Sequence, residues 1–170
     1  MTPAGTRSVL RISVHYGGIA MAKFEGSIDV NVPVRTAYDQ WTQFETFPQF
    51  MEGVEEVRQV NDTKLEWRAE IGGRTEEWEA EITEQIPDQR IAWTSRTGAK
   101  NAGVVTFHHI DDTTTRVMLQ VEYEPETVVE HAGAALGVVE RRMKGDLERC
   151  KEFIESRGEA TGAWRGKIEH

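Results

Sequence analysis

The sequence contains little cysteine, no long hydrophobic run and fewer basic than acidic residues. Cys150 is the only cysteine, so the chain can form neither an intramolecular disulfide nor a cysteine-based zinc cluster, and we expect a reducing, cytoplasmic location. No segment reaches the roughly 18 to 20 apolar residues of a membrane-spanning helix, which argues against an integral membrane protein. Twenty basic against 29 acidic residues give a net charge of -9, which disfavours nucleic acid as a partner.

Recognisable catalytic and metal-binding motifs are also lacking. The sequence has no Gly-rich phosphate loop, no Gly-x-Ser-x-Gly elbow and no His-Glu-x-x-His. His108 and His109 are adjacent, and neighbouring residues of a strand point to opposite faces, so both cannot bind one metal ion. We therefore expect no metal and no cofactor. Cys150 falls on an apolar helical stripe without a His partner at useful spacing, which predicts a buried side chain and not a nucleophile.

The chain divides into one domain with two extensions. We expect residues 1–20 to be a poorly ordered N-terminal extension, residues 21–158 to form the domain, and residues 159–170 to be a polar tail without its own core. Within the tail, Trp164 is a candidate to dock back onto the domain.

Strands with a two-residue period occupy most of the domain. The first spans residues 23–31, and Pro33 then favours a short helix through Trp41, followed by a second short helix that Pro48 interrupts. Six further strands follow, among them a hairpin with a turn at Gly72-Gly73 in which apolar residues alternate with charged ones.

The period changes after Pro125. Apolar residues recur at three- and four-residue steps from Val128 to Ile154, which predicts one long amphipathic helix ending near Gly158. Seven one-sided strands and one such helix bury their apolar surfaces if the sheet curves around the helix. The fold class is therefore α+β: a seven-stranded curved antiparallel sheet around a long C-terminal helix, with two short helices after the first strand.

Several segments resemble those of the polyketide cyclase/dehydrase family of the START-like helix-grip superfamily. They are Val30-Asn31-Val32-Pro33-Val34, the corner from Trp41 to Pro48, Trp78-Glu79-Ala80-Glu81-Ile82, and Ile91-Ala92-Trp93. The resemblance covers Met21 to about Arg157. It implies a helix-grip fold. It also implies a small hydrophobic ligand as the partner, because this superfamily includes lipid carriers, coenzyme-Q-binding proteins, plant hormone receptors and aromatase/cyclases.

We expect a ligand pocket between the inward face of the sheet and the first half of the last helix, which is rich in small residues. We expect two groups of residues to line it: strand residues whose side chains alternate in step with the inward-facing apolar ones, and residues on the apolar side of the helix. They are Trp67, Trp78, Trp93, Ser95, Phe107, Tyr123, Ala132, Ala135, Leu136 and Val139. Close packing of a core also explains the same aromatic side chains. The sequence does not define the oligomeric state.

Two polar residues share the inward parity and are candidates for proton transfer. Glu76 shares the parity of Trp78, and His109 that of Phe107; each lies at a strand end, where a surface position is the alternative. The leading hypothesis is a binder or carrier of a lipid, quinone or aromatic metabolite. A cyclase or dehydrase using Glu76 or His109 is the second hypothesis, and a stress or interaction module with a vestigial cavity is the third.

Overall fold

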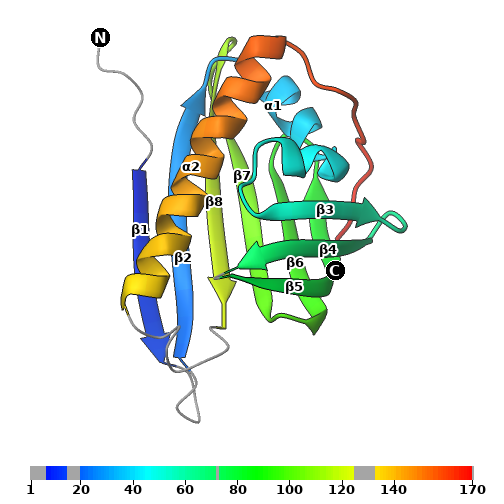
Figure 1. Ribbon diagram of the computed structural model, residues 1–170. Helices are drawn as coiled ribbons and strands as arrows, with labels where there is room; N and C mark the ends of the chain where they lie inside the picture. The colour runs from blue at the N-terminus through cyan, green and yellow to red at the C-terminus, as the bar shows by residue number, and fades with distance from the viewer. Residues whose placement is uncertain (1–6, 15–19, 72, 125–132, 170) are drawn as a thin grey trace.

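The computed structural model (Figure 1) describes residues 7–14, 20–71, 73–124 and 133–169. Its elements are β1 Arg7–Val14, β2 Ala20–Val30, α1 Val34–Trp41, the 3-10 helix η1 Phe44–Gln49, β3 Val54–Gln59, β4 Lys64–Ile71, β5 Arg74–Ile86, β6 Arg90–Gly98, β7 Asn101–Asp111, β8 Thr114–Tyr123 and α2 Gly133–Arg157. Within these ranges, no helix is long and apolar enough to cross a membrane.

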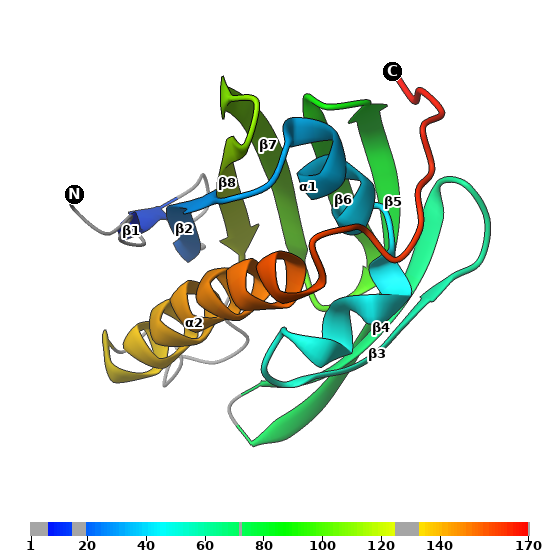
Figure 2. The ribbon, with the colours of Figure 1, turned by 90° about the horizontal axis from the view of Figure 1, so that it is seen from above.

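All strands belong to one antiparallel sheet in the order β1-β2-β8-β7-β6-β5-β4-β3. The sheet curls strongly, and α2 crosses its concave side nearest β1 and β2 (Figures 1 and 2). In the β4–β5 hairpin Trp67 lies opposite Trp78 and Leu65 opposite Ala80, so the apolar residues that alternate along the two strands share one face. This is a helix-grip fold, as the sequence predicted.

The first residues differ from the sequence expectation. The seven predicted strands are present, but Arg7–Val14 adds an eighth, β1, which pairs with β2 from Arg7–Ser27 to Val14–Ala20. A segment expected to be a poorly ordered extension thus contains a strand. Its content of Val and Ile suits a strand, and its pairing supplies partners for backbone groups along an edge of β2.

An aromatic corner closes one end of the curved sheet. Trp41, Phe44, Phe47 and Phe50 are each 5% exposed or less, and Phe47 contacts the other three rings edge to face. The helix α1 begins directly after Pro33, whose carbonyl accepts a bond from Ala37 N–H at 3.1 Å. The two short helices therefore seal the core at this end, which we call the closed end.

On the described part of α2, Leu147, Cys150 and Ile154 pack into the core, each 3% exposed or less. The predicted buried position of Cys150 is confirmed. Burial raises the pKa of its thiol to about 12, which keeps the thiol protonated at neutral pH and unreactive as a nucleophile.

Candidate ligand-binding site

The concave face of the sheet changes from fully buried to partly exposed along its strands. Toward the closed end, Ile91, Val105 and Val117 are each 1% exposed. Nearer the end of β8, Trp93 and Tyr123 have the same strand parity as these residues but are only partly buried. The helix α2 begins at this end of the sheet (Figure 1). Large apolar side chains that face the interior of a sheet but remain partly exposed to solvent are typical of a pocket wall. We call this end of the sheet the open end.

Two tryptophans extend this wall onto β4 and β5. The indole rings of Trp67 and Trp78 stack at 5.6 Å between centroids with an interplanar angle of 8°, and both are partly buried. Phe47 contacts Trp67 at 5.8 Å and links the wall to the closed end. The Trp67 Nε1–H is buried, and none of the described residues accepts a hydrogen bond from it.

A glycine shapes the wall beneath Trp93. Gly103 on β7 lies opposite Trp93 on β6, and a Cβ at position 103 would come within 2.4 Å of the indole ring. Because position 103 has no side chain, the Trp93 ring can lie directly against β7. A glycine inside an apolar strand was the only sequence signal of this close approach.

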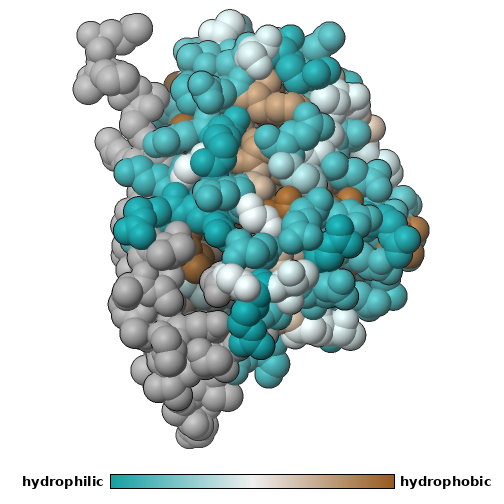
Figure 3. Space-filling view, viewed as in Figure 1, coloured by the Kyte–Doolittle hydropathy of each residue, from teal (hydrophilic) through white to brown (hydrophobic). Residues whose placement is uncertain are grey.

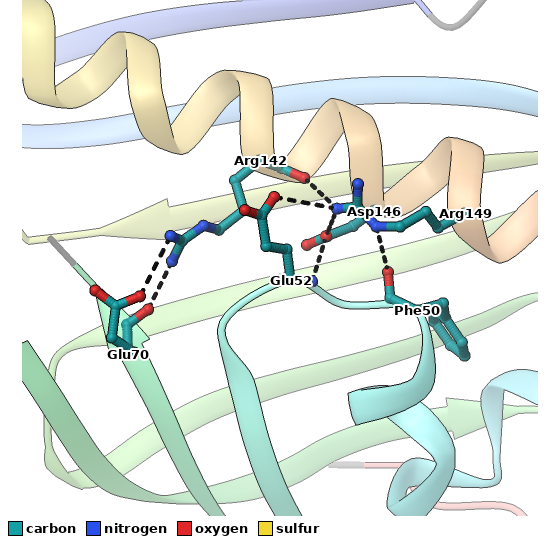
Figure 4. A network of polar contacts seen from close by, with 6 residues as sticks. All are labelled: Phe50, Glu52, Glu70, Arg142, Asp146 and Arg149. Atoms are coloured by element: carbon teal, nitrogen blue, oxygen red, sulfur yellow. Dashed lines mark hydrogen bonds and ion pairs between the residues drawn. The ribbon is translucent and has the colours of Figure 1, made fainter. Parts of the chain in front are cut away.

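A polar network joins α2 to the other side of the concave face (Figure 4). The Arg142 guanidinium donates to the Glu70 carbonyl oxygen at 2.6 Å, and a second nitrogen lies 3.5 Å from the Glu70 carboxylate. A Cβ at Gly53 would lie 2.5 Å from Arg142 Nη1, so this arginine reaches Glu70 across a position without a side chain. The contact connects α2 to the end of β4.

Asp146 and Arg149 form the second part of this network. The Asp146 carboxylate accepts the Glu52 N–H at 2.8 Å and pairs with Arg149, and Arg149 donates to the Phe50 carbonyl at 3.0 Å. Burial raises the pKa of Asp146 to about 6, although the Glu52 N–H and Arg149 oppose the rise. We call Glu52, Glu70, Arg142, Asp146 and Arg149 the rim network.

The rim network was not predicted from the sequence. Arg142 and Glu70 are 72 residues apart and belong to elements whose proximity no local pattern indicates. In the space-filling view, taken from the side of Figure 1, hydrophilic residues dominate the surface and apolar residues show between them (Figure 3). A polar rim over apolar walls is the usual construction of a small-molecule site.

The structure places the two proton-transfer candidates at opposite ends of the sheet. Glu76 lies beyond the Gly98 end of β6, since Trp78 pairs with Gly98. His109 lies beyond the other end, where it is exposed and 3.6 Å from Asp112. The length of β6 between them is roughly 30 Å at the usual rise of a strand, so Glu76 and His109 do not form a pair.

The other predicted lining residues lie in different surroundings. Phe107 is 5% exposed and packs edge to face on Tyr38 at 5.4 Å, so it belongs to the core at the closed end. Val139 is partly buried on α2. Ala132 and the side chains of Ala135 and Leu136 lie outside the described residues.

Ser95 lies beside a shallow hollow at the turn between β6 and β7. The Ser95 hydroxyl oxygen accepts the Asn101 N–H at 3.0 Å, and the hollow, of about 480 Å³, is lined mainly by polar and exposed residues. A second hollow of about 570 Å³ lies among charged residues of β3–β5 such as Arg58 and Arg68, and Trp67 and Trp78 also contribute to its lining. Charged or exposed residues surround both hollows, so neither is an enclosed apolar pocket.

The curled sheet, the gripping helix and the concave aromatic wall define the START-like helix-grip class. The chain belongs to the family described as polyketide cyclase/dehydrase and lipid transport, whose model matches residues 30–152. A relative, an uncharacterized 17.2 kDa protein from the melC2-rnhH intergenic region of Streptomyces lincolnensis, is 58% identical over 149 residues, 87% of this chain and 99% of that protein.

Solved structures with the same fold come from several bacteria. The Zhui aromatase/cyclase of Streptomyces sp. R1128 has a TM-score of 0.68 at 16% identity, covering 85% of this chain and 99% of its own. A START superfamily protein of Mycobacterium smegmatis has a TM-score of 0.62 at 17% identity, with coverages of 79% and 95%. A Deinococcus radiodurans protein has a TM-score of 0.62 at 25% identity, with coverages of 78% and 97%.

Proposed function

We propose that this protein binds a small hydrophobic molecule against the aromatic wall formed by Trp67, Trp78 and Trp93. The observation that carries the proposal is that these side chains lie on the same face of the sheet as the core residues but remain partly exposed at the open end. A ligand that covers them removes apolar surface from water, at about 25 cal/mol per Å². The lipid-transport part of the family description supports the same reading.

Fluorescence titration with the neutral apolar probe N-phenyl-1-naphthylamine tests this proposal. We expect the wild-type protein to bind the probe, and Trp78→Ala to weaken binding about tenfold or more because it removes half of the stacked pair. Trp164→Ala in the C-terminal segment is the matched control and should leave the affinity unchanged. Equal affinity in Trp78→Ala and wild type, or no binding at all, would contradict the proposal.

A second candidate function is that of a cyclase or dehydrase, with Glu76 transferring a proton. The family description and the aromatase/cyclase among the structural neighbours support it. Glu76 is partly buried, two residues from Trp78 on the same strand, and a carboxyl group beside a bound carbonyl compound can act as a general acid or base. His109 has no part in this proposal because it is remote from the wall.

Glu76→Gln separates the enzyme from the carrier. If Glu76 transfers the proton, turnover of a poly-β-ketone substrate, followed by absorbance of the aromatic product, should fall at least a hundredfold while probe affinity stays within a few-fold. Glu77→Gln, an exposed neighbour on β5, is the control and should keep full turnover. Equal turnover in Glu76→Gln and wild type would remove Glu76 from the mechanism.

A further inference from the structure

Gly103 occupies an interior position of β7 that its backbone conformation does not explain. It pairs with Trp93 on one side and with Val121 on the other, and unlike Gly98 at the end of β6 it has no positive φ. A glycine inside a regular strand weakens the strand, and it often marks a place where another group comes close. The reason for this glycine therefore lies in the room that its missing side chain leaves.

The Trp93 indole fills the room above Gly103. A Cβ at position 103 would lie 2.4 Å from Cζ2 and 2.8 Å from Cη2 of the indole, whereas nonbonded carbon atoms are normally about 3.5 to 4.0 Å apart. The Gln120 carbonyl oxygen lies 2.9 Å from the same Cβ, so β7 cannot relieve the contact by shifting toward β8. With a side chain at position 103, the outer edge of the indole must move by about 1 Å or more.

The surroundings of Trp93 decide the direction of this movement. Ile82 on β5 lies opposite Trp93 and is fully buried, so the indole cannot turn toward β5 without displacing a core side chain. Trp93 is only partly buried, and the sheet covers one side of its ring. The free space lies on the concave side, so a side chain at position 103 would raise the indole from the sheet into the ligand site.

We propose, on the basis of the ligand site proposed above, that Gly103 determines how broad a ligand this site accepts. The missing side chain keeps the Trp93 indole against β7 and leaves the space above the ring to the ligand. A broad, rigid ligand cannot adapt to a raised indole, whereas a single alkyl chain can bend past it, and overpacking costs most where neither partner can relax. Gly103 is thus a specificity-determining residue that acts through Trp93.

Competition against N-phenyl-1-naphthylamine with two neutral alcohols of equal carbon number tests this role. Decan-1-ol is a single flexible chain, and 1-adamantanol is a rigid cage. We expect Gly103→Ala to weaken the binding of 1-adamantanol about tenfold or more and that of decan-1-ol less than about threefold. Adding Trp93→Phe, which removes the outer edge of the indole, should restore the wild-type ratio of the two affinities to within about threefold.

Gly166→Ala is the matched control. Its Cβ would also lie 2.4 Å from an indole ring, that of Trp164 in the C-terminal segment, and both affinities should equal those of the wild type. The same ratio of affinities in Gly103→Ala and wild type would overturn the role of Gly103 and leave the proposed ligand site intact. A wild-type protein that binds none of the three probes would overturn both.

NMR of the wild-type protein tests the same geometry if Gly103→Ala does not fold. One Hα of Gly103 points where the Cβ would lie, so we expect a nuclear Overhauser effect between it and Trp93 Hζ2. We expect another between the Trp93 indole protons and bound 1-adamantanol. The absence of either effect contradicts the role proposed for Gly103.

Discussion

Replacing Gly53 by alanine is expected to lower the free energy of unfolding by about 3 kcal/mol or more. Gly53 has φ of +84°, and a Cβ there would lie 2.7 Å from the Glu70 carbonyl oxygen and 2.5 Å from Arg142 Nη1. The left-handed backbone alone costs a residue with a side chain about 1 to 2 kcal/mol. The clash adds to this, because the β4 backbone must shift and Arg142 must leave Glu70.

Gly73 provides a matched control for this prediction. Its φ of +82° is nearly the same, but an added Cβ would meet nothing within 4 Å. Gly73→Ala should therefore cost only the backbone term of about 1 to 2 kcal/mol. Urea unfolding of both variants measures the difference, and equal losses would show that the rim network adds nothing at Gly53.

Asp146 is expected to make the protein more stable at pH 4 than at pH 7, all else being equal. Its pKa is raised from 3.8 to about 6 in the folded protein by burial. Between these values the folded state binds more protons than the unfolded state, so this contribution to stability is present below about pH 4 and is lost as the pH rises through 6. Two pKa units correspond to about 3 kcal/mol.

Asp146→Asn isolates this contribution from that of other carboxyl groups. The asparagine has nearly the same shape and an oxygen that can accept the Glu52 N–H, but it does not titrate. Between pH 4 and pH 7, the free energy of unfolding of Asp146→Asn minus that of the wild type should therefore rise with pH. For Glu152→Gln, a change at an exposed residue of the same helix, this difference should stay level. Parallel stability curves for wild type and Asp146→Asn would contradict a raised pKa.

Local patterns were sufficient to predict strands β2 to β8 and the helix α2, but not β1. Alternating side chains placed Trp67 and Trp78 on the apolar face of a hairpin, and in the structure the two residues are cross-strand partners. The three- and four-residue period similarly placed Leu147, Cys150 and Ile154 on the buried face of α2. Such predictions succeed because burial on one side of a strand or helix repeats with the period of its backbone.

The contacts made by single polar residues could not be predicted in this way. Arg165 and Asp39 are 126 residues apart and Gln40 and Thr161 are 121 apart, and neither pair belongs to a repeating pattern. The polar segment 159–169 therefore read as a tail, although it docks on α1 and pairs with β5 at Gln85. The alternation of side chains along a strand also failed to distinguish Phe107 from Trp93, because both point inward. Phe107 fills the core, whereas Trp93 lines the open end.

The position of β2 between β1 and β8 has a consequence during synthesis. Val30 pairs with Thr115 and Ala22 with Tyr123, so one edge of β2 has no partner until roughly 85 to 100 more residues have been translated. At about 5 to 20 residues per second, this takes between roughly 5 and 20 s. For that time the nascent chain presents a free strand edge and the apolar side chains of Phe24 and Ile28, a surface of the kind that aggregates and that chaperones protect.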